Sequence, residues 1–335
     1  MAKAKAFLGT AYSARSNNVA CQRAINIYFS VGDTKEEKEI GCFYGTPGKV
    51  LLATVGTGPI RGFNIMSGIL YVVSGNTLYS VTSSLVVTEL GTLQTASGPV
   101  SMINNGPFSL GSYGQVMVVD GVDGYVWDTS TNLYTPNVLN GVNSLGIVPK
   151  FLCYQDGFGI VNNDGSDAFY QSGATTSGVS NFLVWDALNY ASESGEPGSI
   201  VAMIDSQREV FLIGDTWTAV WINAGAAGFA FQRLQGVWIE RGCLAPYSTT
   251  LVGGNICLLG QDKAGGGIVY MQKGYDLERI STHAIEHQIQ SYATMTDAVG
   301  YGYQQEGNLF YVLSFPTGGE TWVYDVTTSQ QIGKP

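Results

Sequence analysis

The chain has 335 residues and a formal net charge of −10, and only 13% of its residues are charged. An ordinary soluble domain carries about 25% charged residues. Apolar residues make up 45% of the chain and aromatic residues 12%, a composition that excludes intrinsic disorder. The negative net charge disfavours a general nucleic-acid binder, because it repels phosphate. The 44 glycines disfavour a coiled coil or a helical bundle.

The first 58 residues contain no repeated pattern. They include a charged patch, Asp33–Glu39, which is typical of a solvated loop. We therefore expect residues 1–58 to form an extended N-terminal docking segment. Residues 59–335 are expected to form one domain.

A short apolar strand followed by a turn and a second strand recurs six times after residue 58. The first strands begin 42 to 53 residues apart and are predicted at Leu70–Val73, Val116–Val119, Phe158–Val161, Val210–Ile213, Ile256–Leu259 and Leu309–Val312. The second strands are predicted at Leu78–Val81, Tyr125–Trp127, Ala168–Tyr170, Ala219–Trp221, Ile268–Tyr270 and Trp322–Tyr324. Glycine-rich or Asp/Asn-rich turns separate the two, including Ser74–Asn76, Asn163–Gly165 and Gly265–Gly267.

One hairpin per about 45 residues leaves room for one or two further strands, which is the size of a β-propeller blade. The sequence therefore predicts an all-β protein with a propeller of about six blades and an irregular N-terminal segment. A β-sandwich is the alternative, because strand spacing alone does not separate the two folds. The one helix that we expect covers Thr282–Ile289, with Ser281 or Thr282 as its cap.

The charge is concentrated in one stretch. Between Gly62 and Gln207, Lys150 is the only basic residue and there are eleven acids, so this stretch carries the whole net charge of −10. Turn formation accounts for part of this count, because Asp side chains bind the local backbone in turns. We also consider an acidic face that attracts a basic partner or repels a polyanion.

The residues that most often carry catalysis or bind metals form no recognisable pattern. The five cysteines are Cys21, Cys42, Cys153, Cys243 and Cys257, and their wide spacing indicates neither a disulfide framework nor a zinc cluster. His283 and His287 would share one helical face, but their order with Glu286 is not that of a metalloprotease. We expect no catalytic residues, no metal and no cofactor. No apolar run is long enough to span a membrane.

Trp185 and Trp238 lie outside the repeated strands and are candidate interface anchors, since Trp is enriched at interfaces. The acidic stretch could also supply the paired carboxylates of a glycosidase. A glycan-binding or glycan-cleaving propeller is therefore a second functional hypothesis.

Several segments resemble the packaged-DNA stabilisation proteins of short-tailed bacteriophages, which form the tail hub or nozzle. They are Ala24–Tyr28, Gly45–Gly48, Ile60–Gly62, Trp185–Glu193, Leu212–Gly214, Phe229–Arg233 and Gly236–Ala245. From these segments we take as candidate interface residues Pro47, Gly48, Arg61, Trp185, Asp186, Trp238 and Arg241. The family usually continues beyond the last blade, whereas this sequence ends at Pro335. A strand from the N-terminal segment is one way to close that blade.

The resemblance implies a structural virion protein of the tail that is not an enzyme. Its subunits would form a ring, by resemblance a hexamer, that continues the portal channel and helps to retain packaged DNA. The implied partners are other copies of the chain, the portal-adaptor ring, and the tail needle or a tailspike. Double-stranded DNA would pass through without sequence-specific binding. Assembly would take place in the cytoplasm of the host bacterium.

Overall fold

The computed structural model describes residues 25–31, 41–107, 114–174, 180–195 and 197–332. Strands dominate this part of the chain, which confirms the all-β prediction. The chain divides into two compact units, each described here by itself. Unit 1 comprises Met1–Val50 and Arg241–Pro335, and unit 2 comprises Leu51–Glu240. The boundary at residue 58 stays a prediction, and the charged patch Asp33–Glu39 lies outside the described residues.

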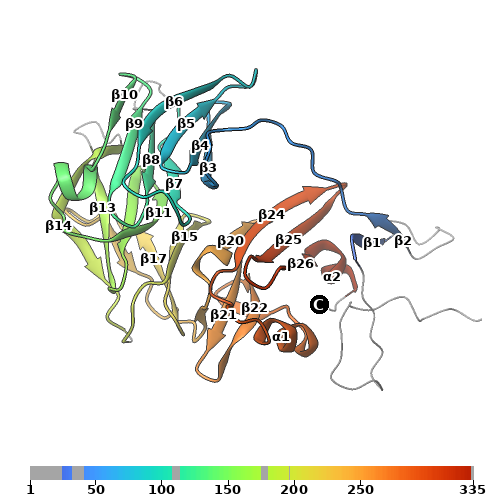
Figure 1. Ribbon diagram of the computed structural model, residues 1–335. Coiled ribbons are helices and arrows are strands. Elements are labelled where there is room, and N and C mark those ends of the chain that lie inside the picture. Colours follow the sequence, from blue (N-terminus) through green and yellow to red (C-terminus); the bar gives the residue numbers. More distant parts are fainter. Residues whose placement is uncertain (1–24, 32–40, 108–113, 175–179, 196, 333–335) are drawn as a thin grey trace, which may run out of the picture. The chain divides into compact units, whose positions relative to one another are not determined.

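Unit 2 consists of four antiparallel sheets of four strands each, which follow one another along the chain (Figure 1). The first two are β3 (Ile60–Met66), β4 (Ile69–Ser74), β5 (Thr77–Val81) and β6 (Val87–Thr92), then β7 (Ser101–Asn104), β8 (Gln115–Val119), β9 (Gly124–Asp128) and β10 (Leu133–Thr135). The next two are β11 (Pro149–Gln155), β12 (Phe158–Asn163), β13 (Ala168–Ala174) and β14 (Ser180–Ser192), then β15 (Ala202–Ser206), β16 (Glu209–Ile213), β17 (Thr218–Asn223) and β18 (Phe231–Arg233). A single π-helical turn, Val138–Val142, follows β10.

Neighbouring sheets of unit 2 pack through their first strands and share their cores. β3 contacts β7, β7 contacts β11, and β11 contacts β15. In strand β8, the four consecutive residues Val116–Val119 are all apolar and all buried. Val116 and Val118 belong to the cluster shared with the preceding sheet, whereas Met117 and Val119 belong to the cluster shared with the following sheet. Both faces of this strand are therefore buried between blades.

Unit 1 holds two further blade sheets, a separate hairpin and two helices. The hairpin is β1 (Ile27–Val31) and β2 (Gly41–Gly45), and the five-stranded sheet is β19 (Gly242–Cys243), β20 (Thr250–Val252), β21 (Asn255–Asp262), β22 (Gly265–Lys273) and β23 (Asp276–Arg279). The last sheet has three strands, β24 (Val299–Gln305), β25 (Asn308–Phe315) and β26 (Glu320–Asp325). The helices are α1 (His283–Gln290) and α2 (Val326–Ile332), and a 3₁₀ turn covers Pro246–Ser248.

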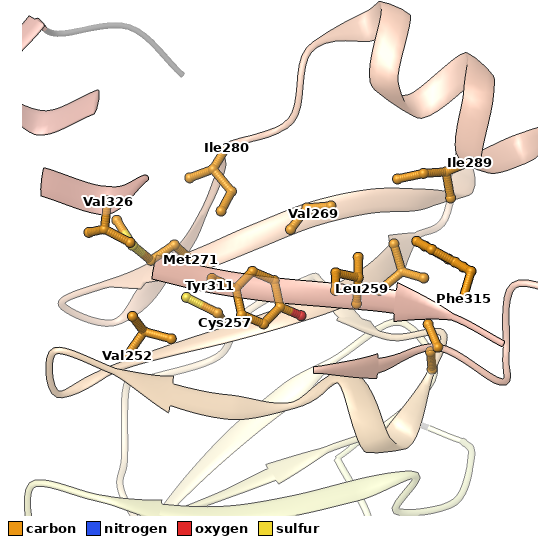
Figure 2. Close-up of a cluster of buried hydrophobic side chains, with 13 residues drawn as sticks. Val252, Cys257, Leu259, Val269, Met271, Ile280, Ile289, Tyr311, Phe315 and Val326 are labelled. Atoms are coloured by element: carbon orange, nitrogen blue, oxygen red, sulfur yellow. The ribbon is translucent and has the colours of Figure 1, made fainter. Parts of the chain in front are cut away.

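One hydrophobic cluster joins the two sheets of unit 1 to both helices. Figure 2 shows Leu259 and Val269 of the first sheet beside Tyr311 of β25, together with Ile289 of α1 and Val326 of α2. All these side chains are less than a tenth exposed. Burial of such side chains stabilises a fold by about 1.5–3 kcal/mol each. The cluster therefore fixes α1 and α2 to the blade sheets.

Four blades in unit 2 and two in unit 1 give the six-bladed propeller arrangement, which confirms the predicted fold class. All twelve predicted strands are present. They are the central pair of each four-stranded sheet, β21 and β22 of the five-stranded sheet, and the last pair of the three-stranded one. One predicted turn is wrong. Gly265–Gly267 open β22, and the turn lies at Lys263 and Ala264, because a register shift at Gly260 and Gln261 extends the pairing.

The predicted helix is confirmed, but its cap differs from the expectation. Thr282 occupies the N-cap position without donating or accepting a side-chain hydrogen bond there. The hydroxyl of Ser281 instead donates to Glu286 Oε1 over 2.6 Å. In place of a side-chain cap at the backbone N–H groups, the helix has this hydrogen bond between Ser281 and the buried Glu286 carboxylate.

The N-terminal segment is not wholly irregular, because β1 and β2 form an antiparallel hairpin. Tyr28 of this hairpin packs edge-on against Phe310 of β25, with ring centroids 5.1 Å apart. Among the described residues, the hairpin does not hydrogen-bond to the three-stranded sheet as a fourth strand. Residues 1–24 lie outside the described part of the chain.

Candidate functional site

The described residues contain no group of three or more His, Cys, Asp or Glu side chains arranged to hold a metal ion.

His283 and Glu286 of helix α1 both contact Arg279, which ends strand β23. Arg279 binds the buried carboxylate of Glu286 with two nitrogens, at 2.6 and 2.5 Å, and its Nη2 also lies 2.7 Å from His283 Nδ1. Glu286 thus ties α1 to the end of β23. Cys42, Cys153, Cys243 and Cys257 are free thiols.

The acidic stretch Gly62–Gln207 does not form a face made of all its acids. Asp120, Asp123, Asp128 and Glu193 are each less than a tenth exposed. A buried carboxylate requires hydrogen bonds or a charged partner to offset the loss of water. The surroundings of these four carboxylates show that each has such partners, so the hypothesis of one continuous acidic face is wrong for them.

Asp120 and Asp123 organise the turn between β8 and β9. Asp120 Oδ1 accepts the backbone N–H groups of Val122 and Asp123, at 3.0 and 3.1 Å. Asp123 Oδ1 accepts the backbone N–H groups of Gly124, Leu139 and Asn140, at 2.7 to 3.0 Å. This confirms the interpretation of these residues as turn formers, and it fixes the π-helical turn against the hairpin.

Asp128 belongs to a buried polar network at the other end of the same sheet. Gln115, which is fully buried, donates to Asp128 Oδ2 over 3.0 Å and accepts the backbone N–H of Phe182 over 2.8 Å. Burial alone raises the pKa of Asp128, but hydrogen bonds from Ser130, Gln115 and Thr131 outweigh burial and lower it. Gln115 therefore links the second sheet to the third, and Asp128 holds the Gln115 side chain in place.

Glu193 lies at the end of β14 and binds two partners from the fourth sheet. The indole Nε1 of Trp221 donates to Glu193 Oε2 over 2.9 Å, and Arg233 Nη1 lies 3.3 Å from Oε1. A Cβ atom on Gly195 would lie 2.8 Å from Arg233 Nη1 and 2.9 Å from Glu193 Oε1. The chain therefore passes close to this ion pair at Gly195, and a larger residue there would have to displace the ends of the Arg233 and Glu193 side chains.

Trp238 makes two ring contacts within unit 2. One face stacks on Trp217, with ring centroids 5.6 Å apart and an interplanar angle of 17°. Arg233 lies over a ring of Trp238, 4.7 Å from its centroid. The ring of Trp238 is thus already in contact with two side chains of its own unit, which does not favour the glycan hypothesis at this residue.

The seven candidate interface residues belong to two units and differ in exposure, and their role in an interface stays a prediction. Pro47 and Gly48 are exposed on the connection after β2, and Asp186 is exposed on β14. Arg61 is buried, and its guanidinium donates to the carbonyls of Gly75, Thr95 and Gly98. Arg241 pairs with Asp276 and lies over Tyr270, 5.5 Å from the ring centroid.

Trp185 is an internal anchor rather than an exposed one. It is 5% exposed, and its Nε1 donates to the carbonyl of Phe182 over 2.7 Å. Its backbone N–H donates to Asn143 Oδ1 over 3.2 Å. The exposed apolar side chains near it are Val184, Leu188 and Tyr190, which are 49%, 81% and 48% exposed.

Leu188 stands on a rigid bulge of the outer strand β14. Tyr190 pairs with Tyr170 and Trp185 pairs with Ser172, so four residues of β14 lie opposite one residue of β13. Asp186 Oδ1 accepts the backbone N–H of Leu188 over 2.8 Å, which closes a local turn inside the bulge. We define Val184, Leu188 and Tyr190 as the β14 patch. Sequence reasoning missed it because it gave weight to the tryptophan instead.

The protein is thus a six-bladed β-propeller. Its buried carboxylates form hydrogen bonds that hold its turns and sheets together, and its outer strand β14 exposes apolar side chains. A family model described as Bacteriophage P22 Gp10, beta-propeller, matches residues 9–335. The chain therefore belongs to this family of phage structural proteins and is a structural tail protein of a virion.

Comparison with solved structures gives remote similarities. The chain is similar to PorZ, a surface component of the type-IX secretion system of Porphyromonas gingivalis, at 11% identity and a TM-score of 0.46, over 81% of this chain and 33% of that one. It is similar to apo AztD from Citrobacter koseri at 9% identity and a TM-score of 0.45, over 90% and 76% of the two chains. The chain thus spans about a third of PorZ. A search of curated proteins found no match.

Proposed function

We propose that this protein is the ring-forming subunit of a phage tail hub, with no enzymatic activity. The ring would continue the portal channel, help to retain the packaged DNA and mount the rest of the tail. Its partners would be other copies of this chain, by family resemblance five of them, the portal-adaptor ring, and the tail needle or a tailspike. Assembly would occur in the host cytoplasm before the virion is released.

The observation that carries this proposal is the match of the P22 Gp10 family model to residues 9–335, almost the whole chain. The β14 patch adds a physical reason for association. Its side chains sit on a bulge that is fixed from within by Asp186 and by the buried Trp185, so docking them against a partner would order little new chain. Rigid apolar anchors of this kind carry much of the binding free energy at protein interfaces.

The charge of the chain fits a channel protein that does not hold DNA tightly. With a net charge of −10, the protein would repel phosphate and release no counterions on DNA contact. Part of the negative charge is internal, because four of the eleven acids in Gly62–Gln207 are buried. The proposal therefore rests on a surface poor in Lys and Arg rather than on an acidic wall.

In vitro assembly with the portal-adaptor ring tests the proposal. We expect the purified chain to add to the adaptor ring as a closed ring of subunits, visible by negative-stain electron microscopy. Binding of DNA restriction fragments at physiological salt is expected to be undetectable in the same preparation. Failure to bind the adaptor ring, or enzymatic release of reducing sugar from host polysaccharide, would contradict it.

A further inference from the structure

The hairpin that joins β5 to β6 in unit 2 carries an apolar tip. Leu85, Val86 and Val87 follow one another there and are 43%, 57% and 37% exposed. From Phe63 to Thr88 the sequence contains no charged residue. Contiguous exposed apolar side chains are typical of interaction sites, whereas single ones are common on any surface. We define Leu85, Val86 and Val87 as the β6 tip.

The β6 tip is held in a backbone conformation that leucine rarely adopts. Leu85 has a φ of 62°, in the left-handed region where glycine and asparagine are the usual residues. The backbone N–H of Leu85 donates to the carbonyl of Thr82 over 2.9 Å, and that of Thr82 donates to the carbonyl of Val86 over 3.1 Å. Thr82 Oγ1 also accepts the N–H of Val86 over 3.2 Å. Backbone strain that is fixed in this way clusters at functional sites, and here it displays a half-exposed leucine.

We propose that the β6 tip of one copy docks against the β14 patch of the next copy in the ring. This inference rests on the proposed function for the ring itself and names the two surfaces that meet in it. Neighbours in a ring contact each other through a heterologous interface, which joins two different surfaces of the same chain. The β6 tip and the β14 patch are two such surfaces, because β6 and β14 are the outer strands of separate blades of unit 2 (Figure 1).

Charge favours this pairing over other contacts between copies. The stretch Gly62–Gln207 holds one basic residue and eleven acids, so two copies repel each other wherever their exposed acids meet. The β6 tip has no charged residue, and β14 has one, Asp186. Asp186 Oδ1 already accepts the N–H of Leu188. The tip therefore meets the β14 patch without bringing a like charge of its own against Asp186.

The positions of the two blades fit the geometry of a closed ring. In a six-bladed propeller neighbouring blades are about 60° apart, so the first and third blades of unit 2 point in directions about 120° apart. Each subunit of a six-membered ring also has its two neighbours in directions about 120° apart. When the propeller axis is parallel to the ring axis, the β6 tip and the β14 patch of one subunit can contact both of its neighbours at the same time.

Cross-linking between two differently substituted chains tests this inference directly. Full-length Leu85→Cys chains are mixed with Leu188→Cys chains and treated with a short bis-maleimide, with Cys21 and the exposed Cys42 replaced by Ser in both. We expect at least about tenfold more cross-linked dimer than in a mixture in which Leu133→Cys, on the outer strand β10, replaces Leu188→Cys. Equal yields from the two mixtures, or cross-links mainly between identical chains, would overturn the inference.

Leu85→Asn separates docking from folding, because asparagine adopts the left-handed conformation readily. We expect this variant to raise Tm by about 2 °C and to weaken association between subunits at least about tenfold. Unchanged association, or a lower Tm that assigns Leu85 to folding, would overturn the inference. The proposed function is judged separately. A closed ring without the cross-link between positions 85 and 188 removes only this inference, the cross-link in chains that form no closed ring removes only the ring, and the absence of both removes both.

Discussion

Trp221 Nε1 donates a hydrogen bond to Glu193 Oε2 over 2.9 Å inside unit 2, and this contact joins the end of the third blade to the fourth. The carboxylate is 1% exposed and has Arg233 as its second partner. An acid that appeared in the sequence to belong to a charged surface thus acts as an internal connector between blades.

Replacing Glu193 with Ala is expected to destabilise the protein by about 2 kcal/mol or more, because it leaves a buried indole N–H and a half-buried guanidinium without their acceptor. Glu193→Gln, which keeps an acceptor for Trp221, is expected to cost less. Urea denaturation measures both. Glu89→Gln, an exposed acid on β6, is the control, and equal stability of E193A and E89Q would contradict the structural role.

Asp128 should contribute stability that depends on pH with a definite sign. Its pKa is lowered in the folded protein because hydrogen bonds from Ser130, Gln115 and Thr131 outweigh burial. A lowered folded pKa gives stability that is present above the unfolded pKa and is lost as pH falls through the folded pKa. We therefore expect Asp128→Asn to lower Tm at pH 7 and to differ less from the parent as pH approaches 3. A constant difference across this range would contradict the assignment.

Asp205 should show the opposite behaviour. Burial raises the pKa of its carboxyl, although backbone hydrogen bonds, including one from Tyr154, act against burial. A raised folded pKa means that the ionised form is penalised in the fold, so stability falls as pH rises from the unfolded to the folded pKa. Asp205→Asn is expected to raise Tm at pH 7 and to converge with the parent at low pH. Thermal melts over the same pH series as for Asp128 measure it, and a lower Tm at pH 7 would contradict this view.

Arg61 should matter for folding rather than for assembly. Its guanidinium donates to three carbonyls and to the hydroxyl of Thr95. Lysine has no planar fork of donors, so Arg61→Lys is expected to cost about 1–3 kcal/mol of folding free energy. Chemical denaturation measures this cost. Arg208→Lys, at an 81% exposed side chain, is the control.

The β14 patch should matter for assembly rather than for folding. Leu188→Asp introduces a charge at an 81% exposed position and is expected to weaken binding between subunits at least about tenfold, with Tm unchanged. Leu133→Asp on β10, at 58% exposure, makes the same change on another outer strand and is the matched control. Assembly titrations with the adaptor ring compare the two, and equal effects of both variants would remove the patch from the interface.

The central strands were predictable from the sequence because they are buried between blades on both faces. Val116–Val119 is apolar at every position for this reason. The outer strands were not predictable. β10 and β18 have three residues each, and their contacts are mainly with one neighbouring strand, so no periodicity marks them. The bulge of β14 depends on the pairing register with β13, which no local pattern reveals.

The orientation of single side chains was predicted less well than the fold. A sequence does not show whether a Trp or Arg side chain points outward or inward, and Trp185 and Arg61 both point inward. The buried acids were partly foreseen, because Asp120 and Asp123 stand in turn-forming contexts. The burial of Glu193 could not be predicted from the local sequence, since its partners Trp221 and Arg233 follow 28 and 40 residues later.

In the described residues no helix is long and apolar enough to cross a membrane.

Native mass spectrometry of the full-length chain, alone and with the portal-adaptor ring, tests the central claim most directly. The account predicts a closed oligomer, by family resemblance of six subunits, that forms alone or on the adaptor ring. A chain that remains a monomer under all conditions, including in the presence of the adaptor ring, would contradict it.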